Sequence, residues 1–131
     1  MAYLVDADWI INAATKRYRA HEILEELAPA GILVSLTTLA EVYEAAYNSP
    51  NPQAYIDAYK RVFGQFQIAN LNEDIIFRFA EVRALLRRQG RLIPDFDILL
   101  GVTAVHYDLT LLTFNIRHLD RIPGIRVYQH P

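Results

Sequence analysis

The chain has 131 residues, of which 53% are hydrophobic and 21% charged, and a net charge of −2. This size and composition fit one folded domain, residues 1–131, and exclude a disordered chain. Because the chain contains no cysteine, disulfide scaffolds, thiolate metal sites and thiol nucleophiles are excluded as well. Acids interrupt the apolar N-terminal run, which lacks a basic leader, and no window reaches the roughly 18 apolar residues of a membrane span, so we expect a cytoplasmic protein.

The first half of the chain alternates between short apolar runs and helical patterns. Thr37 or Thr38 can cap a helix that carries Glu41 and ends near Tyr47, before a segment rich in Asn and Pro. In chain order we expect a strand over residues 2–6, a helix from about Asp8 and a second helix over 19–27. A strand over 31–35 follows, and then this third helix, from Thr37 or Thr38 to about residue 47.

The second half continues the alternation. Asn72 is expected to cap a long helix that ends at Gly90, and Pro94 to open the next helix. We expect a helix over residues 53–63 and a strand over 66–71, followed by helices over 72–90 and 94–107. A strand over 109–114 and a final edge strand over 125–129 complete the chain. Alternation of this kind predicts an α/β fold, a three-layer α/β/α sandwich with a mostly parallel sheet.

Acidic and amide side chains fall where this fold would place a ligand. In an open parallel sheet, ligands bind beyond the carboxyl ends of the strands. Polar residues from four segments are expected at that edge: Asp6 and Asp8, Glu41, Asp95 and Asp97, and Asn115. Taken singly, each acid can be a helix cap or a solvated side chain, and Asp8 is a natural cap. Of Asp95 and Asp97 we expect one to be structural, and we favour Asp95 for that role.

Gathered carboxylates repel one another by about 4 kcal/mol per pair at 4 Å for an effective dielectric constant near 20. Protons, basic partners or a divalent cation can offset that repulsion. An all-oxygen ligand set suits Mg²⁺, with Mn²⁺ as a substitute. Zinc is disfavoured, because we expect none of the histidines next to a proposed ligand; they are His21, His106, His118 and His130.

The motifs also resemble those of a known family, the PIN-domain ribonucleases, and in particular the VapC-type toxins of toxin–antitoxin systems. YLVDADWIINA (3–13) is similar to the family's opening strand and first acid. SLTTLAEVYEAA (35–46) is similar to its second motif, with a Thr three residues before an acid. The segment 91–127 resembles the third, with an acid before an apolar pair, a strand ending in Thr-x-Asn, and an Ile-Pro-Gly turn.

The resemblance implies a Mg²⁺-dependent endoribonuclease in which Asp6, Glu41 and Asp97 are the catalytic, metal-binding acids. Asp95 is then either a further metal ligand or structural. Asp8, Thr38, Thr113 and Asn115 would orient ligands and water. It also implies three partners: an RNA substrate, a cognate antitoxin protein and a second copy of the chain in a homodimer.

Three features depart from the family pattern. Asn115 stands where some members have a fourth acid, Ala45 or Ala46 stands where a Gly is common, and Leu100-Gly101-Val102 replaces Ile-Ala-Ala. No central carboxylate is lost. Two competing classes are a haloacid-dehalogenase-type phosphatase, which also begins with Asp-x-Asp but needs a Lys and an acidic motif that we do not find, and a catalytically silent PIN-like scaffold.

Two further groups of side chains are candidates for contacts with partners. Arginine outnumbers lysine by eleven to two, and one dense cluster, Arg83, Arg87, Arg88 and Arg91, is either an RNA or antitoxin contact or a solvated helix end. Five aromatic residues around the Pro50 loop form either a dimer or antitoxin surface or part of the core: Tyr43, Tyr47, Tyr55, Tyr59 and Phe63.

Overall fold

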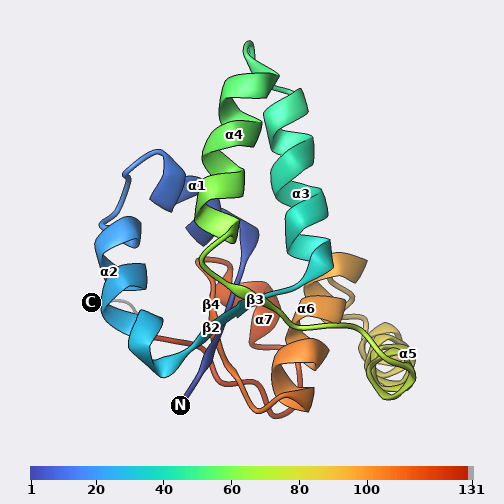
Figure 1. Cartoon of the computed structure of the whole chain (residues 1–131). Coiled ribbons are helices and arrows are strands. Elements are labelled where there is room, and N and C mark those ends of the chain that lie inside the picture. Colours follow the sequence, from blue (N-terminus) through green and yellow to red (C-terminus); the bar gives the residue numbers. More distant parts are fainter. Residues whose placement is uncertain (130–131) are drawn as a thin grey trace.

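The computed structural model describes residues 1–129 and has a four-stranded parallel sheet at its centre (Figure 1). The strand order is β3-β2-β1-β4, with Leu4 of β1 paired to Leu33 of β2 and to Leu111 of β4. The strands are β1 (Tyr3–Val5), β2 (Ile32–Val34), β3 (Gln67–Ile68) and β4 (Thr110–Leu112). All four run in the same direction, so their carboxyl ends meet at one edge.

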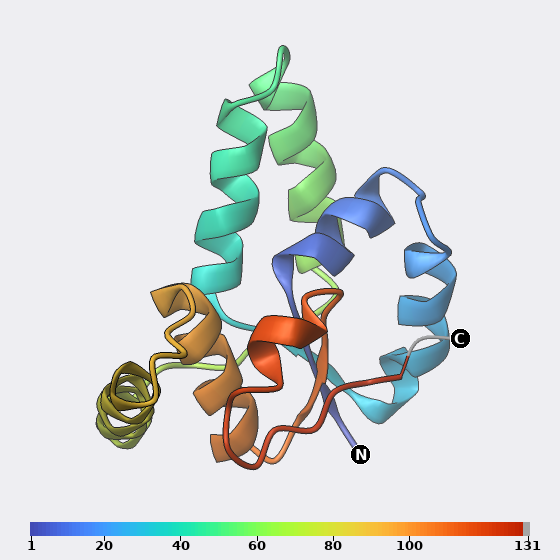
Figure 2. The same cartoon turned by 180° about the vertical axis from the view of Figure 1, so that it is seen from behind.

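Helices cover both faces of the sheet, which confirms the three-layer α/β/α prediction. One face carries α1 (Ala7–Ala14), α2 (Ala20–Leu27), α3 (Leu36–Tyr47) and α4 (Pro52–Phe63), with the short 3-10 helix η1 (Ala28–Ala30) before β2. The other face carries α5 (Glu73–Arg88), α6 (Asp95–His106) and α7 (Ile116–Leu119). Figure 2 shows the sheet from behind, with α5 and α6 on the side away from α2.

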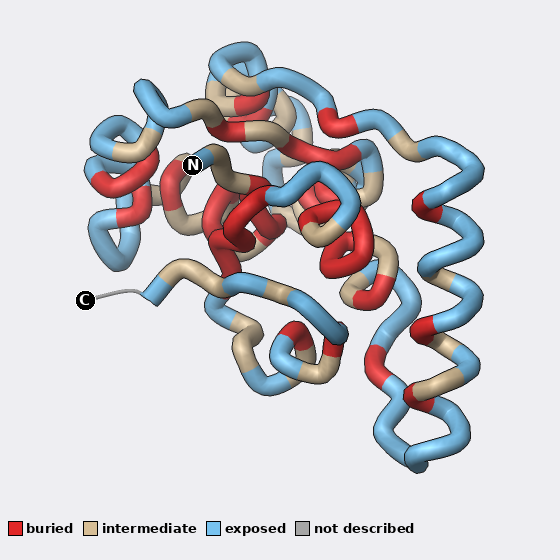
Figure 3. Tube along the Cα trace, turned by 90° about the horizontal axis from the view of Figure 1, so that it is seen from below, coloured by how far each residue is buried: buried red, intermediate tan, exposed pale blue. Residues whose placement is uncertain are grey.

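Two hydrophobic clusters hold the layers together, because successive strand residues point to opposite faces. Val5 packs with the first group of helices, whereas its neighbour Leu4 packs with the second. The same alternation separates Leu112 from Leu111 in β4. In Figure 3 the buried residues gather on the strands and on the inner sides of the helices. Among residues 1–129, no helix is long and apolar enough to cross a membrane.

The boundaries of the predicted helices agree with the structure to within about two residues, but α7 was not predicted and two caps differ. Asp6, rather than Asp8, is the N-cap of α1. Ser35, rather than Thr37 or Thr38, is the N-cap of α3, and its Oγ accepts a hydrogen bond from the Thr38 backbone N–H at 3.3 Å. Asn72 caps α5 as predicted, accepting from the Ile75 N–H at 2.9 Å.

All five predicted strands are shorter in the structure, and two of them differ most from the prediction. The turn after α4 still holds Phe66, whose N–H donates to the Phe63 carbonyl, so only Gln67–Ile68 of residues 66–71 forms a strand. The edge strand predicted over 125–129 is wrong. The Ile125 N–H donates to the Ile122 carbonyl in a turn, and after this turn only a single bridge, Leu111 to Val127, forms beside β4.

The aromatic residues around the Pro50 loop divide between the two alternatives that the sequence left open. Tyr59 and Phe63 are buried in the core, because they lie on the side of α4 that faces the rest of the protein. Tyr47 and Tyr55 are exposed. The chain therefore offers a smaller aromatic surface here than the sequence indicates.

Candidate active site

The carboxyl edge of the sheet brings together side chains from all four predicted segments. Asp6 follows β1, Glu41 lies in the first half of α3, Asp97 in the first turn of α6, and Asn115 just beyond β4. The start of α6 lies beside the first turns of α3 in both views (Figures 1 and 2).

Asp6 is the most tightly held of these acids. It is the N-cap of α1, where Oδ1 accepts from the Ala7 N–H at 2.7 Å. Its other oxygen, Oδ2, accepts from the Thr113 hydroxyl at 2.7 Å. The residue is only 6% exposed, and this burial raises the pKa of Asp6 above its ordinary value. The two hydrogen bonds oppose that rise and the negative charge of Asp97 adds to it.

A second set of hydrogen bonds holds Asp97. Asn115 Nδ2 donates to Asp97 Oδ2 at 3.1 Å, and the Asn115 backbone N–H donates to the Thr113 hydroxyl at 3.0 Å. Through Thr113 and Asn115, the carboxylates of Asp6 and Asp97 therefore belong to one continuous network. At the start of α6 the helix dipole also favours a negative side chain.

His118 is a residue that the sequence analysis missed. Its Nδ1 lies 3.1 Å from Asp97 Oδ2 and 3.0 Å from Asn115 Nδ2, so the prediction that no histidine approaches the acids is wrong. The short helix α7 folds His118 back over Asn115 at a spacing of three residues. That Asn-x-x-His spacing is the one signal in the sequence that could have revealed it. His21 and His106 lie elsewhere, and His130 lies outside the described residues.

Burial and the negative charges gathered at this edge raise the pKa values of Asp8 and Glu41. Burial, reinforced by the charge of Asp6, raises the pKa of Asp8 to about 7. Burial and the charges of Asp6 and Asp97 raise the pKa of Glu41 to about 7 as well. Asp8 Oδ2 accepts from the Phe114 N–H at 3.0 Å, but Oδ1 is buried and has no hydrogen-bond partner within residues 1–129. The acids are therefore close enough to interact and incompletely neutralised by protein groups.

This donor set fits a hard divalent cation. The donors nearest the edge are carboxylate oxygens, and a cation would lower the repulsion that raises the pKa values of Asp8 and Glu41. Within residues 1–129 no three His, Asp or Glu side chains form a ready-made cage around one point. Mg²⁺ does not require such a cage, since it keeps several waters and binds directly through one or two carboxylates.

The remaining predicted residues occupy the surroundings of the acids. Thr38 is fully buried and its hydroxyl reaches the Val5 carbonyl at 3.5 Å, which ties α3 to the end of β1. Asp95 is exposed and accepts from Arg83 Nε at 2.8 Å. Arg87, Arg88 and Arg91 are exposed at the end of α5 and in the loop that follows it.

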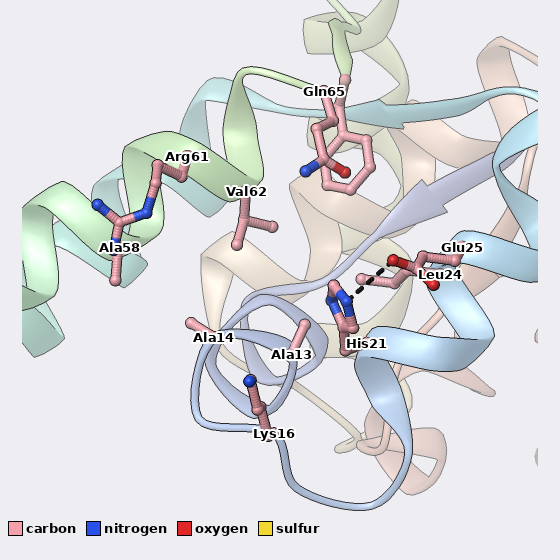
Figure 4. Close-up of a pocket in the computed structure, with 11 residues that line it drawn as sticks. Ala13, Ala14, Lys16, His21, Leu24, Glu25, Ala58, Arg61, Val62 and Gln65 are labelled. Atoms are coloured by element: carbon pink, nitrogen blue, oxygen red, sulfur yellow. Dashed lines mark ion pairs between the residues drawn. The ribbon is translucent and has the colours of Figure 1, made fainter.

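One pocket lies away from the acids, between α1, α2 and the end of α4 (Figure 4). It has a volume of about 330 Å³, a floor of small apolar side chains such as Ala13 and Ala58, and an ion pair between His21 and Glu25 at its wall. None of the acids predicted from the sequence lines it.

Comparison with known proteins identifies the family. The PIN domain family matches residues 3–125, and the chain therefore belongs to the PIN-domain family. It is 25% identical to Ribonuclease VapC1 of Haemophilus influenzae strain R2866 over 96% of both chains, and 29% identical to Ribonuclease VapC1 of Methanocaldococcus jannaschii over 95% of this chain and 85% of that one. The solved structure of VapBC2 from Rickettsia felis bound to a promoter DNA fragment matches with a TM-score of 0.89 and 25% identity over 98% of both chains.

Proposed function

We propose that this chain is a VapC-type toxin, a divalent-metal-dependent endoribonuclease that hydrolyses RNA phosphodiester bonds. The observation that carries the proposal is the network that joins Asp6, Thr113, Asn115 and Asp97 at the carboxyl edge of the sheet. Its full-length relatives bear the name ribonuclease, which agrees with that site chemistry. Membership of the PIN family argues against the phosphatase alternative.

Asp6, Glu41 and Asp97 are the residues that we assign to holding Mg²⁺ or Mn²⁺, directly or through water. When bound, such an ion lowers the pKa of a water molecule and offsets the negative charge that develops on the phosphate. The charges of Asp6 and Asp97 both raise the pKa of Asp8, so we assign Asp8 to the same site as a supporting acceptor. Asp95 is paired with Arg83 at the surface, so we assign it a structural role.

The chain's own residues keep the acids in place while RNA is bound. Thr113 and the Ala7 N–H fix both oxygens of Asp6, so this carboxylate cannot turn away from the edge. Asn115 and His118 do the same for one oxygen of Asp97. Since these anchors lie at the start of α1, in the loop after β4 and in α7, the geometry of the site depends on how these segments pack.

RNA must approach an acidic edge on a chain of net charge −2, so cations elsewhere have to attract its phosphates. Arg87, Arg88 and Arg91 are exposed near the start of α6, and Arg83 is tied to that start through Asp95. We assign this arginine cluster to RNA phosphates. For the protein partners we propose a cognate antitoxin, in line with the solved VapBC complex of a relative, and a second copy of the chain, which is implied only by the resemblance of the motifs.

The test is cleavage of a pool of total tRNA and ribosomal RNA by purified chain free of any antitoxin. Discrete fragments that require Mg²⁺ and disappear with EDTA or with Asp6→Asn would support the proposal. The matched control is Asp108→Asn, because Asp108 is exposed at the opposite end of β4 and pairs only with Arg126 among the described residues. Folded protein that neither cleaves RNA nor binds Mg²⁺ or Mn²⁺ by calorimetry would instead favour the catalytically silent scaffold.

A further inference from the structure

A row of aromatic rings leads from the core to the rim of the candidate active site. Trp9 is buried, and the ring of Phe114 stacks on it with centroids 5.0 Å apart and planes 12° apart. Tyr18 continues the row, with its centroid 5.9 Å from that of Phe114. Tyr18 is 68% exposed and Phe114 39% exposed, so the outer end of the row faces solvent while its inner end is fixed.

Phe114 is joined to the acids through its backbone. The Phe114 N–H donates to Asp8 Oδ2 at 3.0 Å. Phe114 also stands between Thr113, which donates to Asp6, and Asn115, which donates to Asp97. The position of the Phe114 ring is therefore fixed relative to the carboxylates on which the proposed chemistry depends.

The loop that carries Tyr18 has an unusual backbone. Lys16, Tyr18 and Arg19 all have φ near +57°, a left-handed conformation that side chains other than glycine rarely adopt. The loop is anchored to α1, since the Arg17 N–H donates to the Asn12 carbonyl at 2.8 Å. A strained conformation that holds an exposed tyrosine beside an exposed phenylalanine suggests a role for the pair in binding.

We propose that Tyr18 and Phe114 form a stacking platform for an unpaired base of the RNA, next to the phosphodiester that is cleaved. This inference rests on the proposed ribonuclease function. Stacking of a base on an aromatic ring does not require a positive charge on the protein. It can therefore contribute to binding here, where the acids beside Phe114 repel the phosphates of the RNA. Arg17 and Arg117 are exposed in the loop before Tyr18 and in α7 just after Phe114, where they can meet the phosphates on either side of a stacked base.

The platform implies a substrate class. In a duplex the bases are stacked on one another, and proteins that stack bases on aromatic rings use loops, bulges and single strands. We therefore expect RNA that is single-stranded at the cleaved position, and poor binding of a fully paired duplex of the same sequence.

The experiment measures the binding of fluorescein-labelled, 12-nucleotide, mixed-sequence single-stranded RNA by anisotropy, with Mg²⁺ present and in an Asp6→Asn background that does not cleave. Tyr18→Leu and Phe114→Leu are each expected to weaken binding by about fivefold or more, since stacking on one aromatic ring contributes at least that much. Phe114→Tyr should bind as the parent does. Phe77→Leu is the matched control, because Phe77 is 66% exposed on α5, away from the acids.

A series of RNAs of the same sequence, each with an abasic nucleotide at a different position, distinguishes loss of stacking from a general structural effect of the substitutions. The parent should lose affinity when the base at one position is missing, whereas Phe114→Leu should be insensitive to that loss. Unchanged RNA affinity in both leucine variants would overturn the platform and leave these rings as a surface for a protein partner. If the wild-type chain binds RNA through the rings but never cleaves it, the proposed function fails while the platform stands.

Discussion

The Thr113 hydroxyl donates a 2.7 Å hydrogen bond to Asp6 Oδ2 across 107 positions of sequence. The same hydroxyl accepts the Asn115 N–H, so one small side chain connects the end of β1 to the residue that holds Asp97. Because Asp6 and Thr113 are both buried, the bond is shielded from competing water.

Removing that hydroxyl should therefore cost stability and activity together. Thr113→Val leaves an acid oxygen and a backbone N–H without this partner, and we expect a loss of about 1–3 kcal/mol in the free energy of unfolding. Thr113→Ser keeps the hydroxyl and should lose less than Thr113→Val. Urea unfolding at constant pH measures both variants.

The neighbouring strand residue Thr110 is the matched control. Its buried hydroxyl has no hydrogen-bond partner within residues 1–129, so Thr110→Val should be neutral or stabilising. A Thr113→Val protein as stable as Thr113→Ser would show that the bond to Asp6 contributes nothing.

Asn115→Asp would restore the fourth acid of some PIN proteins. It replaces the Nδ2 donor to Asp97 by an oxygen, which should destabilise the metal-free protein by roughly 1–3 kcal/mol at pH 8. A divalent cation can neutralise the added charge, so Mg²⁺ should raise the Tm of this variant more than that of the wild type. Thermal unfolding with EDTA and with MgCl₂ compares the two.

Asn72→Asp is the corresponding control, because an Asp caps a helix as well as an Asn does and α5 begins far from the acids in sequence. Its response to Mg²⁺ should equal that of the wild type. An Asn115→Asp variant with that same response would mean that the ion does not bind near Asn115.

The stability of the metal-free protein should fall as the pH rises from about 4.5 to about 7. Asp8 and Glu41 have pKa values near 7 in the folded protein, against 3.8 and 4.5 for unperturbed groups. The folded state therefore binds more protons than the unfolded state in this interval, and raising the pH removes a stabilising contribution. Urea midpoints in EDTA at several pH values test the direction.

Asp8→Asn should flatten this pH dependence, and Mg²⁺ should do so at the upper end of the range by replacing the lost protons. Stability that increases with pH between 4.5 and 7 in EDTA would contradict the picture of crowded, poorly neutralised acids.

Gly101 explains why the chain departs from the usual Ile-Ala-Ala pattern in α6. A Cβ at this position would lie 2.6 Å from Ile122 Cγ1, which is too close for any real contact. Gly101→Ala should cost about 1–3 kcal/mol in the wild-type background through overpacking. In an Ile122→Ala background the same change should cost almost nothing, since the clashing atoms are gone. Additive effects in this double-mutant cycle, measured by chemical unfolding, would rule out the contact as the reason.

The sequence was sufficient to predict the parallel sheet and the edge at which the acids gather. Asp6, Asp97 and Asn115 each stand at a strand end or helix start, and parallel strands bring such positions together whatever their separation in sequence. His118 could not be predicted in the same way, because its approach to Asp97 depends on how the short helix α7 folds back, 21 residues away. The burial of Tyr59 follows the helical period of α4, but that period alone left open whether the apolar side of the helix meets the core or a partner.

The most direct test of the central claim is the initial rate of Mg²⁺-dependent cleavage of one identified RNA, measured for single isosteric variants of each acid. Asp6→Asn, Glu41→Gln and Asp97→Asn should each lower the rate by a factor of about 100 or more, while all three remain folded by circular dichroism. Asp95→Asn and Asp108→Asn, which lose only surface ion pairs, should cleave within a few-fold of the wild type. Undiminished cleavage by a folded variant of any of the three acids would remove that acid from the site and contradict the account given above.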